Sequence, residues 1–189
     1  MFNDQSTPFA ALATRRSGKP RDLAAPGPDA GQLESILAMA MRTPDHGKLA
    51  PWRFVVIDDR DAFAALLDRA FRAERPGVGD DALAPVEQFA RQAPVLVVAL
   101  SSPQPDSPIP LWEQQLSAGA ACMNLLHAAH ALGFAGGWLT GWAAYSDMVR
   151  DAFGAAPERI AGFLFLGTPG AALSERPRPD PAQVVRHWP

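Results

Sequence analysis

Residues 114–146 contain no aspartate, glutamate, lysine or arginine, although charged residues make up 20% of the chain. At that frequency, a given window of this length would lack charge roughly 6 times in 10,000. Small and apolar residues run around every side of a helix drawn through residues 114–133. A helix that is apolar on all sides is normally surrounded by protein or lipid. We therefore predict a long central helix, packed against the core on one side and a second copy of the chain on the other.

A membrane-spanning helix is the alternative, because about 21 residues at 1.5 Å each would cross a hydrocarbon core of ~30 Å. The polar residues of the segment oppose this interpretation, since amides and imidazoles are costly in hydrocarbon. They are Gln114, Gln115, Asn124, His127 and His130. Many membrane spans are flanked by a cluster of lysine and arginine, and this segment has no such cluster. We therefore expect protein rather than lipid around this helix.

Apolar periodicity in the rest of the chain predicts shorter helices and buried strands. Helices are expected from Pro8 to Ala13, from Asp29 to Thr43, from Asp58 or Asp59 to Pro76, over residues 83–90 and over residues 146–154. Strands are expected over residues 53–57, 94–100 and 160–167, apolar enough to be buried on both faces. A glycine-rich segment at 134–142 is expected to add a bent fourth strand. This order indicates an α/β or α+β domain built in layers.

The last segment, residues 168–189, contains five prolines. Proline cannot donate to a ladder of strand hydrogen bonds and interrupts helices, so we expect an extended tail without a helix or a central strand. Such a tail is either disordered or wrapped over a neighbouring subunit.

Composition narrows the function classes. The chain has 189 residues, a formal net charge of −3 and a pI of about 5.8, so nothing favours nucleic acid or an anionic membrane as a partner. The single cysteine, Cys122, lies in the uncharged helix and cannot form a disulfide within the chain. The first residues lack the basic and apolar regions of a signal peptide. We therefore expect a cytoplasmic protein of one domain.

Residues 14–18, with the sequence Thr-Arg-Arg-Ser-Gly, combine two guanidinium groups, a hydroxyl and a glycine. Guanidinium groups bind phosphate through paired hydrogen bonds, and Ser17 can donate as well. The segment is therefore a candidate anion site. The same residues also occur on solvated surfaces, and the pattern leaves both interpretations open.

A second polar loop, residues 44–52, places Asp45, His46 and Lys48 between two prolines, and loops of this kind often carry sites. An Asp-His general-base pair would need a nucleophile, and no nucleophile motif is present. A metal site would need more ligands in register than His46, His127 and His130 offer. A ligand-contact loop and a simple polar turn both remain open.

Five features in this order resemble the nitroreductase family of FMN-dependent flavoproteins, and the likeness is closest to a small, minimal-length branch of that family. They are Arg15-Arg16-Ser17, the segment from Arg42 to Phe54, the uncharged helix, Gly136 to Gly141, and Gly162 to Gly167. The resemblance covers about residues 8–185. It implies an α+β fold with a central, mostly antiparallel sheet flanked by helices, and one domain over residues 1–189. It also implies a homodimer with the long helix at its interface, two FMN sites between the subunits, and the tail 168–189 wrapped around the partner.

The resemblance also assigns site residues. It implies that Arg15, Arg16 and Ser17 hold the FMN phosphate and ribityl chain, that Arg42 and His46 lie near the flavin in either subunit, and that Trp138, Leu139 and Thr140 approach the flavin. The branch usually has arginine where this chain has Leu139, so a cation is missing there. A stretch associated with the nicotinamide cofactor corresponds to Ala128, Ala129, His130, Ala131, Leu132 and Gly133.

The function implied is an oxidoreductase that takes hydride from NADH or NADPH onto FMN and reduces nitroaromatics, quinones or similar small acceptors by a ping-pong mechanism. Such chemistry needs no metal and no catalytic side chain, because the flavin carries the hydride. A flavin-binding or flavin-storing homodimer with little turnover is the alternative, favoured by Leu139. A structural dimer without a cofactor is a third possibility.

Overall fold

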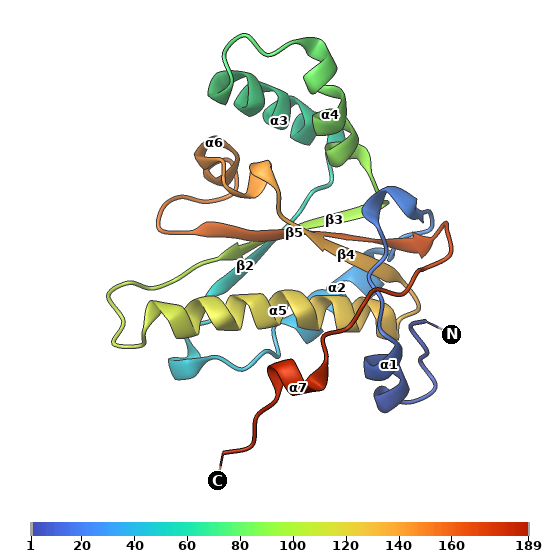
Figure 1. Cartoon of the computed structure of the whole chain (residues 1–189). Helices are drawn as coiled ribbons and strands as arrows, with labels where there is room; N and C mark the ends of the chain where they lie inside the picture. Colours follow the sequence, from blue (N-terminus) through green and yellow to red (C-terminus); the bar gives the residue numbers. More distant parts are fainter. Residues whose placement is uncertain (1, 189) are drawn as a thin grey trace.

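A single antiparallel sheet lies at the centre of the computed structural model, which describes residues 2–188 (Figure 1). Its strands among these residues are β1 (Leu23–Ala24), β2 (Trp52–Val56), β3 (Val95–Ser101), β4 (Ala135–Leu139) and β5 (Arg159–Pro169). Their order is β1-β5-β3-β2, and β4 also pairs with β5. Each of these pairings is antiparallel, which confirms the predicted α+β sheet.

Helices cover both faces of the sheet. Among the described residues they are α1 (Pro8–Thr14), α2 (Ala30–Ala40), α3 (Arg60–Glu74), α4 (Ala84–Arg91), α5 (Leu111–Ala131), α6 (Asp147–Asp151) and α7 (Pro181–Val184). Figure 1 shows α2 and α5 on one face, and α3, α4 and α6 on the other. The predicted long helix is confirmed as α5, with 21 residues. No helix within residues 2–188 combines the length and the apolar character that a bilayer span requires.

The two central strands, β3 and β5, have both faces buried, as predicted. Their side chains alternate between the two helical layers because successive residues of a strand point to opposite faces. One set packs with α3, α4 and α6: Leu96, Val98, Leu100, Phe163 and Phe165. The other set packs with α2 and α5: Val97, Ala99, Leu164 and Leu166.

The prediction that both faces of the strand are buried was wrong for β2, which lies at the edge of the sheet. Arg53 in β2 is exposed, and its guanidinium makes two hydrogen bonds to the Glu158 carboxylate, at 2.6 and 2.7 Å. This bidentate pair lowers the pKa of Glu158 to about 2. An edge strand needs only one buried face, and apolar content alone does not show where a strand lies in a sheet.

Two short elements were not expected from the sequence. β1 pairs with the end of β5, Leu23 opposite Pro169 and Ala24 opposite Thr168, so the tail begins as part of the sheet. The helix α7 contradicts the prediction of a tail without a helix. Asp180 caps it and Pro181 occupies its first position, where a missing backbone N–H costs nothing.

One face of α5 is uncovered in the single chain. Trp112 is 67% exposed and Leu116 is 54% exposed, and Ala120 follows one further turn along the same face. Residues on the opposite face, such as Ala121 and Leu125, are fully buried. The chain alone therefore shields only one side of the helix that we expected to be surrounded.

Candidate functional site

The loop after α1 lies directly on strand β4. The backbone N–H of Gly18 donates to the carbonyl of Gly136 at 3.0 Å. A β-carbon added at Gly137 would lie only 2.7 Å from the Gly18 carbonyl oxygen, which is too close for a real contact. Gly137 is therefore explained by the close approach of two backbones, and this contact fixes Arg15, Arg16 and Ser17 beside the strand.

A surface cavity of about 500 Å³ lies between this loop and β4. Five of the residues that line it are cations and, among these described lining residues, none is acidic. The cations are Arg15, Arg16, Lys19, Arg21 and Arg176. Ser17, Gln92, Trp138 and Leu139 also line the cavity. The structure therefore brings the predicted anion site and the predicted flavin-approaching strand into one cavity.

The positive charge in this cavity is only partly compensated. Burial, together with the neighbouring Arg178, Arg16 and Arg176, lowers the pKa of Arg15. The Nε of Arg16 donates to the Ser174 carbonyl at 2.7 Å and lies 3.6 Å from a Glu175 oxygen, so this guanidinium ties the tail to the loop. An anion bound between Arg15 and Arg176 would relieve the repulsion among these cations.

Arg15 also orients the serine hydroxyl of the site. Its Nη1 donates to Ser17 Oγ at 3.2 Å. Because the hydroxyl oxygen accepts this bond, its own hydrogen remains available to a ligand oxygen. A guanidinium and a hydroxyl placed side by side are the donors that a phosphate group requires.

Trp138 forms an aromatic wall of the cavity and is 36% exposed. Its Nε1 donates to the Ala161 carbonyl at 3.0 Å, and its ring lies so close to Gly162 that a β-carbon there would collide with the indole. Leu139, the next residue, packs at the edge of the core formed with α3 and α4. Thr140 lines a different, adjacent cavity.

Arg42 and His46 lie elsewhere in the chain. His46 Nδ1 is 2.9 Å from Glu113 Oε2 at the start of α5. Near the end of this helix, burial and then the charge of Arg15 lower the pKa values of His127 and His130, so Arg15 lies close to that end. Fourteen residues of α-helix separate Glu113 from His127, about 21 Å at 1.5 Å per residue. Arg42 is exposed after α2. Neither Arg42 nor His46 is among the residues that line the cationic cavity of the described chain.

The stretch expected to contact a nicotinamide cofactor is only half accessible. Ala128, Ala129 and His130 are buried against the core, whereas Ala131, Leu132 and Gly133 are exposed. A ligand at this end of α5 could touch the second group of three residues directly. The buried residues Ala128, Ala129 and His130 could affect such a ligand only through packing. The assignment of this stretch to the nicotinamide cofactor stays a prediction.

His130 is buried with neither ring nitrogen hydrogen-bonded within residues 2–188. Burial, with smaller contributions from the charges of Arg15 and His127, lowers its pKa to about 4. The folded protein therefore holds His130 neutral, while the unfolded chain would protonate it near pH 6.5.

Protein stability is therefore expected to fall as the pH drops from 6.5 toward 4, because the unfolded state binds the additional proton. With those two pKa values, the loss between pH 7 and pH 5 is about 2 kcal/mol. Denaturant unfolding at both pH values measures it, with His130→Leu as the comparison. An equal loss of stability in His130→Leu would contradict this assignment.

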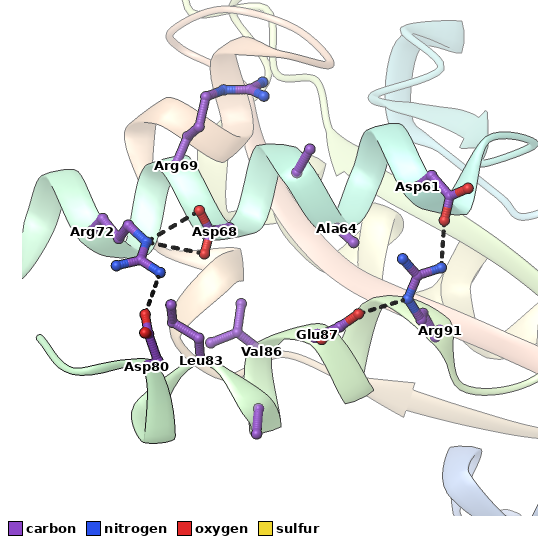
Figure 2. Close-up of a pocket in the computed structure, with 12 residues that line it drawn as sticks. Asp61, Ala64, Asp68, Arg69, Arg72, Asp80, Leu83, Val86, Glu87 and Arg91 are labelled. Atoms are coloured by element: carbon purple, nitrogen blue, oxygen red, sulfur yellow. Dashed lines mark hydrogen bonds and ion pairs between the residues drawn. The ribbon is translucent and has the colours of Figure 1, made fainter.

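A second surface cavity, of about 580 Å³, lies between α3 and α4 (Figure 2). Two of its three arginines form ion pairs within the chain: Arg72 pairs with Asp68 and Asp80 at 3.2 and 2.8 Å, and Arg91 pairs with Asp61 and Glu87. These pairs join the two helices and leave little net charge for a ligand. No group of three or more potential metal-ligating side chains was found within residues 2–188.

Four polar or charged cavity residues were missed by sequence analysis: Lys19, Arg21, Gln92 and Arg176. Lys19 and Arg21 immediately follow the arginine motif, which could have indicated them. Arg176 is remote in sequence and reaches the cavity because β1 pairs with β5 and Arg16 holds Ser174. No sequence pattern indicates such a long-range contact.

The sequence model of the Nitroreductase family matches residues 12–168. The chain is 38% identical to the Escherichia coli K12 protein named "Putative NAD(P)H nitroreductase YdjA" over 181 residues, covering 94% of this chain and 97% of YdjA. Among solved structures, a nitroreductase-like family protein from Bacillus cereus superposes with a TM-score of 0.75 at 20% identity, covering 94% and 93% of the two chains. The nitroreductase NfnB from sphigopyxis sp. strain HMH, described as FMN- and NADPH-dependent, gives a TM-score of 0.75 at 20% identity, covering 97% and 99%.

Proposed function

Because the chain belongs to the nitroreductase family, we propose that it is an FMN-dependent oxidoreductase that takes hydride from NADH or NADPH. Its acceptors on this proposal are nitroaromatics, quinones or similar small molecules. The likeness to YdjA, whose name includes an NAD(P)H nitroreductase activity, supports the reaction class. The name of NfnB, which includes FMN and NADPH, supports the cofactors.

The observation that carries the proposal is the cationic cavity with an aromatic wall. Its volume, about 500 Å³, lies within the usual range for cofactor sites of about 300–1,000 Å³. FMN combines a phosphate with a flat ring system, and both arginines and a tryptophan line the cavity. The donor set therefore fits this cofactor.

Each residue has a defined role on this proposal. Arg15 and Ser17 hold the phosphate, Arg176 adds a further cation, and Arg16 fixes the tail segment that carries Arg176. Lys19 provides an exposed positive charge, and Trp138 excludes water from one side of the ring. When bound, FMN would supply the hydride chemistry, oxidising NADH or NADPH and reducing the acceptor in two successive half-reactions.

A second copy of the chain completes the proposed site. The exposed face of α5, with Trp112, Leu116 and Ala120, is the surface that we assign to the dimer interface. Since neither Arg42 nor His46 lines the cavity of its own chain, both are assigned to the cavity of the partner. The tail beyond Arg178 ends in exposed apolar side chains, and we assign it to the same interface: Val184, Val185 and Trp188.

The visible spectrum of the purified protein tests the proposal. A yellow protein that absorbs at about 450 nm is expected, and this absorbance should bleach under anaerobic conditions with NADH or NADPH. Adding a nitroaromatic or quinone should then restore the colour. Bound flavin that bleaches but reacts with no acceptor would favour the storage function instead. Colour that persists under excess of both nicotinamides would refute hydride transfer.

A further inference from the structure

A small apolar cavity adjoins the cationic one. It has a volume of about 170 Å³ and lies between α3, α4 and the segment that follows β4. Its lining residues carry no charged side chain: Leu67, Phe71, Pro85, Val86, Phe89, Thr140, Gly141, Trp142 and Ala143. The family resemblance assigned only Thr140 among them, so the other side chains are without a role in the proposed reaction.

The size and lining of this cavity suit a single six-membered ring. An apolar protein cavity of about 150 Å³ lined by aliphatic and aromatic side chains stays dry and binds benzene. The present cavity is similar in volume and offers three aromatic rings, from Phe71, Phe89 and Trp142. Aromatic side chains favour edge-to-face and offset contacts with a further ring.

The wall formed by Trp142 is held rigidly. Its indole meets the Phe71 ring edge-on, with centroids 4.8 Å apart and an angle of 86°. Its Nε1 donates to Glu74 Oε2 at 2.6 Å, and the same carboxylate accepts from the Ser146 hydroxyl. The Arg75 guanidinium lies 4.2 Å from the Phe71 ring centroid. A ligand would therefore enter a preformed pocket at little cost in ordering side chains.

The spacing of α3 and α4 is fixed on the other side of the helix pair. Figure 2 shows Arg72 bonded to Asp80 and Arg91 bonded to Asp61, and both pairs link α3 to the segment containing α4. Val86 contributes to both the charged groove and the apolar cavity. The ion pairs therefore tie the two helices together on the side of the helix pair away from the apolar cavity.

The two cavities adjoin along two elements. Leu139 lines the cationic cavity and Thr140 lines the apolar one, and these are consecutive residues. On α4 and just beyond it, Gln92 lines the first and Phe89 the second, one helical turn apart. A ring in the apolar cavity would therefore lie next to a flavin bound in the cationic cavity.

We infer that the apolar cavity is a subsite for the uncharged ring of a one-ring electron acceptor, such as a benzoquinone or a nitrobenzene. This inference rests on the proposed function. Because the lining carries no charge, an anionic substituent of the acceptor would point away from the pocket, toward Arg15 and Lys19. The subsite selects acceptors with one ring and excludes fused ring systems that exceed the volume of the cavity.

Fluorine NMR with fluorobenzene tests the subsite on purified protein, with the FMN content measured separately from the visible spectrum. Saturable binding to the wild-type protein is expected. The substitution Val86→Phe fills the cavity and should weaken binding by at least about tenfold. The matched control, Ala84→Phe, adds the same ring on the groove side of α4 and should change binding by less than about twofold. The KM for 1,4-benzoquinone should rise only in Val86→Phe.

Three results would overturn the inference. They are absence of fluorobenzene binding to the wild-type protein, equal effects of Val86→Phe and Ala84→Phe, and loss of the fluorine signal when the protein is saturated with FMN. The last result would show that the ring of the cofactor itself occupies the cavity. Failure of the proposed function is measured separately, by the visible spectrum. It would appear as a protein that binds no FMN, or as bound FMN whose absorbance does not bleach with NADH or NADPH.

Discussion

Replacing Arg15 and Ser17 together with alanine is expected to weaken FMN binding by at least about a hundredfold. The change removes the guanidinium and the hydroxyl that the phosphate would bind, and hydrogen bonds to charged groups contribute about 1.5–3 kcal/mol each. Two such bonds already correspond to a factor of more than about 100 in the dissociation constant. Fluorescence titration of the flavin-free protein with FMN measures the effect.

Arg69→Ala serves as the control for this double substitution. Arg69 lines the charged groove of Figure 2, so its removal lowers the net charge by the same amount at a different place. Its FMN affinity should match that of the wild-type protein. Size-exclusion chromatography and circular dichroism should show that both variants are folded and elute as the wild-type protein does. Unchanged flavin affinity in a folded Arg15→Ala, Ser17→Ala protein would refute the phosphate assignment.

The substitution Leu116→Arg is expected to convert the proposed dimer into a monomer. Leu116 lies in the middle of the exposed apolar face of α5, and an unpaired guanidinium buried there would cost several kcal/mol. Light scattering during size-exclusion chromatography should give half the wild-type mass. The flavin content should fall with it, because the separated chain loses Arg42 and His46 of its partner.

Met148→Arg introduces the same group on α6, at a side chain that is 44% exposed. Figure 1 shows α6 on the face of the sheet opposite α5, so this variant should stay dimeric and keep its flavin. If Leu116→Arg retained the wild-type mass, α5 would not form the interface. If it became a monomer that still bound FMN with wild-type affinity, the partner would contribute nothing to the site.

The fold was largely predictable where local signals and burial agree. The helices predicted to start at Pro8 and at Asp29 are α1 and α2, and local caps fix their starts: Thr7 caps α1, and Asp29 with Gln32 forms a capping box at α2. Prediction was less accurate where the burial of a strand depends on its position in the sheet. An apolar strand at an edge looks like a central one, as β2 does, and β1 is too short to carry a pattern of its own.

The candidate site was only partly predictable, because most of its residues come from distant segments. Arg15 and Trp138 were indicated by family resemblance, and the structure places both in one cavity. Arg176 was missed, since only the pairing of β1 with β5 and the bond from Arg16 to Ser174 bring the tail there. Arg42 and His46 were indicated, but no single chain places them at the cavity.

The contact between Gly18 and the Gly136–Gly137 backbone limits how this protein can be redesigned. The loop and the strand touch through main-chain atoms, so neither side tolerates the bulk that another sequence could bring. Grafting the arginine loop of a relative onto this scaffold would therefore require its matching strand as well. For library construction and chimera design, residues 15–19 and 135–139 form one exchangeable cassette.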